Sequence, residues 1–145
     1  DDVTILTIGP SLYPALTAAD ELSSHGIEAE IIDARTLVPF DYETVLASVA
    51  KTGRLIIVCE AVERGSFANT VSSNVTRLAC ADLKAAPVVL CAPNWIAPGA
   101  DMEDSYAPQP HDICDAILGD FFAEKRVNRR GNRDWDIIDM ARRGI

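Results

Sequence analysis

The stretch GIEAEIIDARTLVPFD, residues 26–41, is an apolar run that ends in charged side chains at the point where the chain must turn. Asp33 and Arg35 stand two residues apart at the end of a predicted strand, so their side chains can point to the same side. A guanidinium there offers a rigid fork to carboxylates or backbone carbonyls. The residues alone leave two interpretations open: a salt bridge within the domain, or a joint to a neighbouring domain or subunit. We expect Arg35 to be at least partly buried and paired with Asp33 or a backbone carbonyl.

Strands and helices alternate on both sides of this stretch. Short β-branched apolar runs predict strands at 3–9, 27–33, 54–60 and 86–92. Amphipathic segments predict helices at 11–26, 41–53, 65–81 and 110–125, with a long proline-containing loop at 93–109. Near-continuous apolar strands joined through helices imply a parallel sheet that is covered on both faces, and right-handed crossovers restrict its topology. The expected fold is therefore α/β: a three-layer α/β/α domain with a mainly parallel sheet in strand order 2-1-3-4.

The helix ends and apolar faces are also readable. Ser11, Asp41 and Ser66 are expected at helix N-caps, and Gly26 and Gly53 at helix C-termini. Apolar residues at spacings of three and four define the faces that should be buried. In the first and third helices these residues are Leu12, Ala15, Leu16, Ala19 and Leu22, and then Phe67, Val71, Val75, Leu78 and Ala79.

The amino-acid composition limits the classes of protein to which the chain can belong. The chain has 145 residues, 48% hydrophobic and 24% charged, which is ordinary for one soluble globular domain. Its apolar runs are shorter than the 18 or more residues of a membrane helix, so we expect no membrane partner. The abrupt start at Asp1 suggests a piece of a longer polypeptide. Four cysteines without a CxxC pair make a zinc site unexpected and favour a reducing, cytoplasmic compartment: Cys59, Cys80, Cys91 and Cys114.

The charge of the chain is unevenly distributed. Residues 125–145 hold seven basic and three acidic side chains, a net charge of +4. Because the whole chain carries −9, residues 1–124 carry a net charge of −13. We therefore divide the chain into a domain over 1–124 and a basic C-terminal tail over 125–145. Within the tail, 134–143 is predicted to form a short helix that carries Trp135 and Ile138. The acidic domain argues against nucleic acid as a partner and favours a basic protein surface.

The predicted strand ends are the natural place to search for a site, because ligands of open α/β sheets gather there. The turn at 9–11, GPS, lacks the glycine fingerprint of a phosphate loop. Glu60 and Glu63 resemble a carboxylate pair for acid–base work, but no base, nucleophile or metal ligand accompanies them in the sequence. We assign no catalytic, cofactor-binding or metal residue. The candidates for an interface are Asp33, Arg35, Glu60, Glu63, Trp135 and Ile138.

Residues 26–61 closely resemble the C-terminal domain of the E1 β subunit of thiamine-dependent 2-oxoacid dehydrogenases, of the pyruvate, branched-chain and acetoin types. The family pattern joins a strand ending D-x-R-[TS]-L-x-P-[LF]-D to a later K-T-[GN]-R and a strand ending in glutamate. The matching residues are Gly26, Asp33, Arg35, Thr36, Leu37, Pro39, Asp41, Lys51, Thr52, Gly53, Arg54 and Glu60. The resemblance covers about residues 2–122. The sequence departs from the family at Cys59, where histidine or glutamate is frequent, at 63–69, and in the longer basic tail.

This resemblance implies an assembly role. In the family the cofactor lies between two other domains, so none is expected to bind this chain, whereas the parent enzyme would use thiamine diphosphate and magnesium to decarboxylate a 2-oxoacid oxidatively. The implied partners are other domains or subunits of E1, in a homodimer or an α2β2 assembly, and the subunit-binding domain of the E2 acyltransferase. That small domain is commonly basic, which suits the acidic body. Two alternatives stay open: the C-terminal domain of another transketolase-like enzyme, or a non-catalytic flavodoxin-like binding module.

Overall fold

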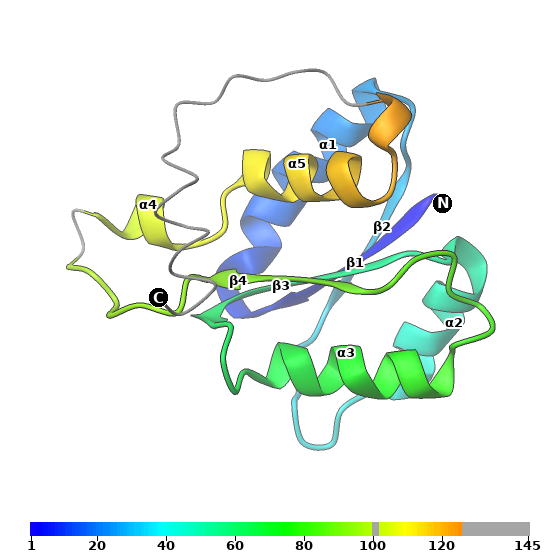
Figure 1. Cartoon of the computed structure of the whole chain (residues 1–145), viewed down its shortest axis with the longest axis horizontal. Helices are drawn as coiled ribbons and strands as arrows, with labels where there is room; N and C mark the ends of the chain where they lie inside the picture. The colour runs from blue at the N-terminus through cyan, green and yellow to red at the C-terminus, as the bar shows by residue number, and fades with distance from the viewer. Residues whose placement is uncertain (100–101, 126–145) are drawn as a thin grey trace.

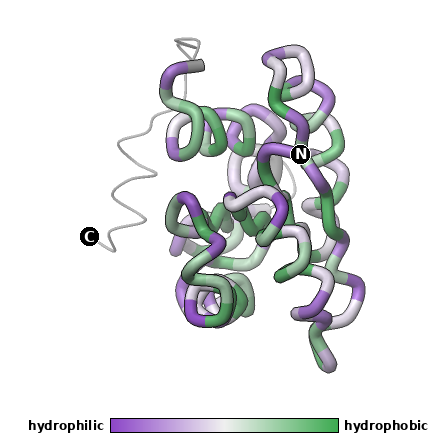
Figure 2. The backbone as a smooth tube through the Cα atoms, turned by 90° about the vertical axis from the view of Figure 1, so that its right-hand side faces the viewer, coloured by the Kyte–Doolittle hydropathy of each residue, from purple (hydrophilic) through white to green (hydrophobic). Residues whose placement is uncertain are grey.

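The computed structural model describes residues 1–99 and 102–125, and these form a four-stranded parallel sheet in the order β2-β1-β3-β4. The strands are β1 (Val3–Ile8), β2 (Ala29–Asp33), β3 (Leu55–Val62) and β4 (Val88–Ala92). Helices α1 (Leu12–Ser24) and α5 (Pro110–Asp120) cover one face, and α2 (Tyr42–Thr52) and α3 (Phe67–Leu78) cover the other (Figures 1 and 2). The predicted three-layer α/β/α fold and strand order are confirmed. The predicted tail helix, with Trp135 and Ile138, lies outside the described residues.

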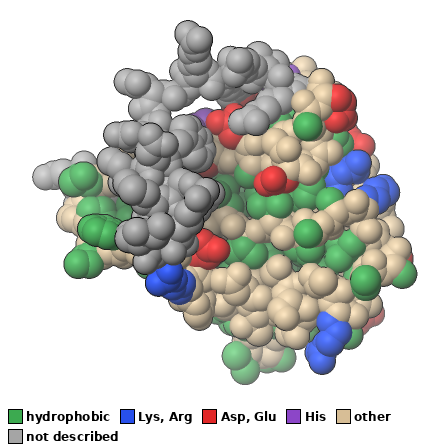
Figure 3. Space-filling view, in the orientation of Figure 1, with side chains coloured by type: hydrophobic (Ala, Val, Ile, Leu, Met, Phe, Trp, Pro, Cys, Tyr) green, Lys and Arg blue, Asp and Glu red, His purple; other side chains and the backbone are tan. Residues whose placement is uncertain are grey.

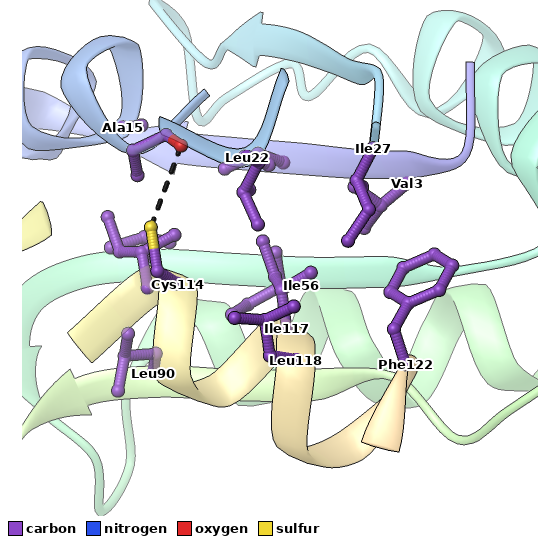
Figure 4. Close-up of a cluster of buried hydrophobic side chains, with 14 residues drawn as sticks. Val3, Ala15, Leu22, Ile27, Ile56, Leu90, Cys114, Ile117, Leu118 and Phe122 are labelled. Carbon is purple, nitrogen blue, oxygen red and sulfur yellow. Dashed lines mark hydrogen bonds between the residues drawn. The ribbon is translucent and has the colours of Figure 1, made fainter. Parts of the chain in front are cut away.

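Two apolar clusters, one on each face of the sheet, form the core. Under α1 and α5, β-strand residues such as Val3 and Ile56 meet Leu22, Ile117 and Leu118 (Figure 4). On this face the Cys114 thiol donates to the carbonyl oxygen of Ala18 at 3.6 Å. The second cluster lies under α2 and α3 and is built from these residues: Leu6, Val45, Val49, Leu55, Ile57, Cys59, Ala68, Val71, Val75, Ala79 and Cys91. Alternate residues of β3 therefore serve opposite layers, as the two-residue period of a strand requires.

Most of the predicted helix ends are confirmed. Asp41 accepts a hydrogen bond from the Thr44 N–H at 3.0 Å, and Ser66 accepts one from the Asn69 N–H at 3.3 Å. Gly53 ends α2 in the left-handed region, with φ +74°. The predicted cap by Ser11 is wrong, because a 3-10 turn, η1 (Gly9–Ser11), precedes α1 and holds Ser11 at φ −58° and ψ −10°. A capping side chain needs an extended backbone there.

The predicted apolar faces of α1 and α3 are correct except at two leucines. Leu16 is 48% exposed and Leu78 is 56% exposed. The buried stripe of α1 runs instead through Ala15, Ala18 and Leu22, so Leu16 lies about one residue's rotation to the side of it. Leu78 is the last residue of α3, and the buried contact passes to Ala79 just beyond the helix.

The long segment after β4 contains more structure than its sequence predicts. A short helix, α4 (Glu103–Tyr106), interrupts the loop expected at 93–109, and a 3-10 turn, η3 (Ala123–Lys125), follows α5. Figure 1 shows this loop and α4 projecting beyond the sheet at its left-hand end. Within the described residues, no helix is long and apolar enough to cross a membrane.

Candidate interaction surface

The carboxyl ends of the four parallel strands meet at one edge of the sheet, and the interface candidates that the structure describes lie along it. Segment 34–41 follows β2, segment 63–66 follows β3, and segment 93–99 follows β4. Because every strand is parallel, these segments converge although they are far apart in sequence. This edge is therefore the place to test what the predicted site residues do.

At the corner after β2, the predicted pairing of Arg35 is confirmed and its predicted burial is wrong. Arg35 Nε donates to Asp33 Oδ2 at 2.9 Å, but the arginine side chain is 83% exposed while that of Asp33 is 27% exposed. The reason is position: β2 is an edge strand of the described sheet, and the chain leaves it outward before returning to α2. An ion pair this exposed stabilises a fold by only about 0–1 kcal/mol. A stabilising salt bridge within the domain therefore does not account well for the Asp33–Arg35 pair.

The same corner presents apolar side chains to solvent. Val38 is 88% exposed and Leu37 is 38% exposed. The following residues turn inward, where the Phe40 ring makes edge contacts with Tyr42 at 4.7 Å and with Phe67 at 5.4 Å between ring centroids. A shallow hollow beside the Asp33–Arg35 pair is lined by Thr36, Pro39, Phe40, Asp41 and Thr44. The base of the loop is anchored in aromatic contacts while its tip is left uncovered.

Glu60 and Glu63 do not line the same hollow among the three that lie at this edge. Glu60 continues the face of β3 that packs under α1, and it lines a hollow with Tyr13, Thr17 and Gln109. Glu63 follows the end of β3, and its backbone carbonyl oxygen accepts hydrogen bonds from the Ser66 N–H at 3.2 Å and from the side-chain amide of Asn69. The register of β3 and β4 shifts between Cys59 and Val62, in the segment that contains Glu60. Neither is brought to the Asp33–Arg35 hollow.

A second apolar surface at this edge was not predicted from the sequence. Trp95 is 67% exposed, Ile96 81% and Val62 38%, and together they line a hollow with Arg64 and Asn94. We call these five residues the carboxyl-edge patch. The backbone there is fixed, since the Arg64 N–H donates to Asn94 Oδ1 at 2.7 Å and the hydroxyl of Tyr106 donates to the Trp95 carbonyl at 3.1 Å. In Figure 3, hydrophobic side chains gather at the left, over the loop that follows β4.

The remaining part of the recognised pattern, residues 51–54, lies at the opposite, amino edge and is structural. Lys51 bridges Glu30 at 2.8 Å, and the Thr52 hydroxyl lies 2.8 Å from that of buried Thr4. The guanidinium of Arg54 lies 4.5 Å from the ring centroid of Phe122, so it fastens the end of the α5 segment to β3. The sequence pattern shared with E1 β subunits therefore combines residues that pack at the amino edge with an exposed loop at the carboxyl edge.

No group of three or more histidine, cysteine, aspartate or glutamate side chains is gathered for a metal ion in residues 1–99 and 102–125. A pair of thiols does meet at the carboxyl edge. Cys59 and Cys91 are register partners on β3 and β4. In the sequence, this pairing was indicated only by the presence of a cysteine near the end of each of two predicted strands. The alignment of the two strands, which makes the cysteines direct neighbours, cannot be predicted from their spacing in the sequence.

Comparison with known proteins agrees with this architecture. Residues 1–113 match the family described as transketolase, C-terminal domain. The chain is 44% identical over 116 residues to the acetoin:2,6-dichlorophenolindophenol oxidoreductase subunit beta of Cupriavidus necator, covering 79% of this chain and 34% of that protein. It is 37% identical over 114 residues to the pyruvate dehydrogenase E1 component subunit beta of Bacillus subtilis, covering 79% of this chain and 35% of that protein.

A solved structure described as a split gene transketolase, inactive beta4 tetramer, matches with a TM-score of 0.66 at 26% identity, over 86% of this chain and 39% of that one. The chain spans about a third of the length of the curated relatives it matches. The resemblance to E1 β subunits is confirmed by these relatives, and the match over residues 1–113 is long enough to decide the family. The chain belongs to the transketolase C-terminal domain family.

Proposed function

We propose that this chain is the C-terminal assembly domain of a thiamine-diphosphate-dependent E1 component, whose parent enzyme oxidatively decarboxylates a 2-oxoacid. The similar relatives that carry the names of E1 and acetoin oxidoreductase β subunits support this proposal. In it, residues 1–124 form the domain that associates with other domains or subunits of E1, as a homodimer or an α2β2 assembly. The basic segment 125–145 is a separate tail.

The observation that carries the proposal is the exposure of ordered apolar side chains along one edge. Val38, Trp95 and Ile96 are each at least 67% exposed, although their loops are held by hydrogen bonds and aromatic contacts. Trp95 and Ile96 are gathered with Val62 in the carboxyl-edge patch, and apolar surface gathered in this way usually marks a protein contact. The exposed guanidinium of Arg35 adds a fork suited to carboxylates across such a contact.

The cofactors belong to the rest of the parent enzyme in this proposal. Thiamine diphosphate and magnesium need a diphosphate and metal site, and the resemblance to E1 β subunits implies that this site lies between two other domains of the parent enzyme. We therefore give this domain no catalytic residue. The four free cysteines fit a reducing compartment, and we place the enzyme in the cytoplasm.

The same proposal includes docking of the E2 acyltransferase through its basic subunit-binding domain. The support is the charge of −13 on residues 1–124, against which a basic domain is electrostatically complementary. We do not assign nucleic acid or a membrane as a partner.

Self-association of the chain tests the carboxyl-edge surface. Sedimentation equilibrium across a range of concentrations should show a dimer that dissociates on dilution, and Ile96→Asp should weaken it at least tenfold. Leu78→Asp is the matched control, because Leu78 is also more than half exposed but lies at the far end of α3, toward the amino edge. A chain that stays monomeric at every concentration, or equal weakening by both variants, would contradict the role given to this edge.

A further inference from the structure

The assembly role leaves the paired thiols of Cys59 and Cys91 without a function. They occupy directly opposed positions on β3 and β4, and both side chains enter the same cluster under α2 and α3. They form the last regular pair of these strands, since the register shifts between Cys59 and Val62. Two thiols that share a face and a register position are close enough to react with one another.

Backbone geometry permits a covalent link at this position. Neighbouring strands lie about 4.8 Å apart, and disulfides join residues whose Cα atoms are about 4.4–6.8 Å apart. The register of β3 and β4 therefore brings the two Cα atoms to a separation that a disulfide spans. Cys114 and Cys80 lack this arrangement: Cys114 lies on the other face of the sheet, and Cys80 is exposed beyond α3.

The neighbouring thiols shift each other's pKa values in opposite directions. Cys91 lowers the pKa of Cys59 below its ordinary value, and the N–H of Ala61 donates to the Cys59 sulfur at 3.4 Å. Cys59, together with burial, raises the pKa of Cys91 above its usual range. The nearby carboxylates of Glu60 and Glu63 oppose thiolate formation at Cys59 and Cys91 respectively. Cys59 is therefore the more readily ionised of the two thiols and the better nucleophile.

The pair also lies at the margin of the core. Each cysteine keeps 7% of its surface exposed, whereas the four residues that precede Cys59 on β3 have none. The Cys91 sulfur lies 3.9 Å from the hydroxyl of Ser66, the cap of α3, at the carboxyl edge. A small oxidant approaching that edge has far less protein to cross than one approaching the centre of the sheet.

We propose that Cys59 and Cys91 form a reversible redox site, in which hydrogen peroxide converts the two thiols into an intrachain disulfide. The Cys59 thiolate attacks one peroxide oxygen and breaks the O–O bond, giving a sulfenic acid and, after protonation of the leaving group, water. The Cys91 sulfur then attacks the sulfenic sulfur, loses its proton and releases a second water. Two electrons pass from the thiols to the peroxide, and a dithiol reductant reverses the change.

The link would join the two segments that carry the carboxyl-edge patch. Val62 and Arg64 follow Cys59, while Trp95 and Ile96 follow Cys91. Such a bond is compatible with a reducing compartment, where disulfides are transient and responsive to oxidants.

Peptide mapping of the folded chain tests the proposal. The chain is treated with hydrogen peroxide, remaining thiols are blocked with N-ethylmaleimide, and a tryptic digest is analysed by mass spectrometry. The expected product joins peptide 55–64 to peptide 85–125 with the loss of two hydrogen masses, and fragment spectra place the bond on Cys91 with Cys114 blocked. Recovery of Cys59 and Cys91 as separately blocked thiols after oxidant has modified exposed Cys80 would overturn the proposal.

Two variants sharpen the result. Cys80→Ser should leave the 59–91 link unchanged, while Cys91→Ser should stop the reaction at a sulfenic acid on Cys59 that dimedone traps. If Cys91→Ser does not fold, as its circular dichroism would show, the wild-type digest still decides the question. A second readout is alkylation of Cys59 by iodoacetamide, whose rate should reach its plateau at a lower pH than that of an ordinary thiol, because Cys91 lowers the pKa of Cys59. A plateau reached only above pH 8 would contradict the nucleophilic role of this thiol.

Discussion

At the scale of single residues, much of what makes this sequence recognisable is packing at turns. Gly53 shows why a particular residue is required. It has φ +74°, and a Cβ atom there would lie 2.7 Å from Cδ of Lys84, whose ammonium group donates to the Thr52 carbonyl at 3.0 Å. Gly65 has a similar φ, +70°, but an added Cβ would meet nothing within 4 Å. Replacing Gly65 by alanine would therefore introduce backbone strain alone, whereas replacing Gly53 would introduce both backbone strain and a clash with Lys84.

Gly65→Ala should lower the free energy of unfolding by about 1 kcal/mol, the cost of a side chain in the left-handed region. Gly53→Ala should cost about 2–4 kcal/mol, because overpacking against the Lys84 stem is added. Urea unfolding followed by circular dichroism measures both. In the background of Lys84→Ala, the penalty for Gly53→Ala should fall toward that for Gly65→Ala. Equal penalties in the unmodified background would show that Lys84 moves aside without cost.

Sensitivity of the fold to acid is a second prediction for single residues. The hydrogen bond from Lys51, followed by that from Ser48, lowers the pKa of Glu30 below 4.5 in the folded chain. A folded pKa below the unfolded value stabilises the fold above pH 4.5, and this stabilisation is lost as the pH falls through the folded pKa. Thr44 lowers the pKa of Asp41 in the same direction.

Glu30→Gln should therefore weaken the loss of stability below pH 4.5 without abolishing it, because Asp41 still contributes. The measurement is the urea midpoint as a function of pH. Lys51→Met should produce a similar flattening, since it removes the group with the largest effect on Glu30. A steeper acid limb in Glu30→Gln than in the unmodified chain would contradict this assignment.

At the scale of elements, the order of strands and helices was predictable because each element carries its own period and its own terminators. Asp41 and Gly53 bound α2 where their chemistry indicates, and the apolar strands alternate with amphipathic helices. The predictions that were wrong concern residues whose environment is set by neighbouring segments of the structure, which a local sequence pattern does not contain. Ser11 is displaced from capping geometry by the 3-10 turn before it, and the burial of Arg35 depended on a covering element that the described chain does not supply.

Two of the three leucines of α1, Leu16 and Leu22, test how far a helical pattern determines burial. Both belong to the predicted apolar face, but Leu22 is fully buried and Leu16 is 48% exposed. Leu22→Ala should lower the free energy of unfolding by about 2–5 kcal/mol, because it leaves a cavity in the cluster under α1 and α5. Leu16→Ala should change it by no more than about 0.5 kcal/mol. Similar losses in the two variants, measured by urea unfolding, would mean that Leu16 is packed in solution.

At the scale of the whole molecule, the two ends of the sheet differ in kind. The amino edge is closed by polar bonds among Thr4, Ser48 and Thr52 and by the stacking of Arg54 on Phe122. The carboxyl edge leaves Val38, Trp95 and Ile96 uncovered. The candidate site was only partly predictable for this reason: sequence placed Asp33 and Arg35 at that edge, whereas the patch arises from segments that only the fold brings together.

The charge of the body makes the docking proposal testable through salt. Residues 1–124 carry −13, so a basic subunit-binding domain from a pyruvate dehydrogenase acyltransferase should bind them more weakly as ionic strength rises. The Debye length shortens from about 10 Å at 0.1 M salt to about 3 Å at 1 M, and steering between opposite charges acts mainly on the association rate. Surface plasmon resonance should therefore show an association rate at least tenfold slower at 1 M salt, with a smaller change in the dissociation rate.

A variant of the basic domain with its arginines replaced by glutamine is the control, and its association rate should no longer depend on salt. Binding that is indifferent to salt would place the contact on the apolar patch alone, and no binding at any salt concentration would remove the acyltransferase from the proposed partners.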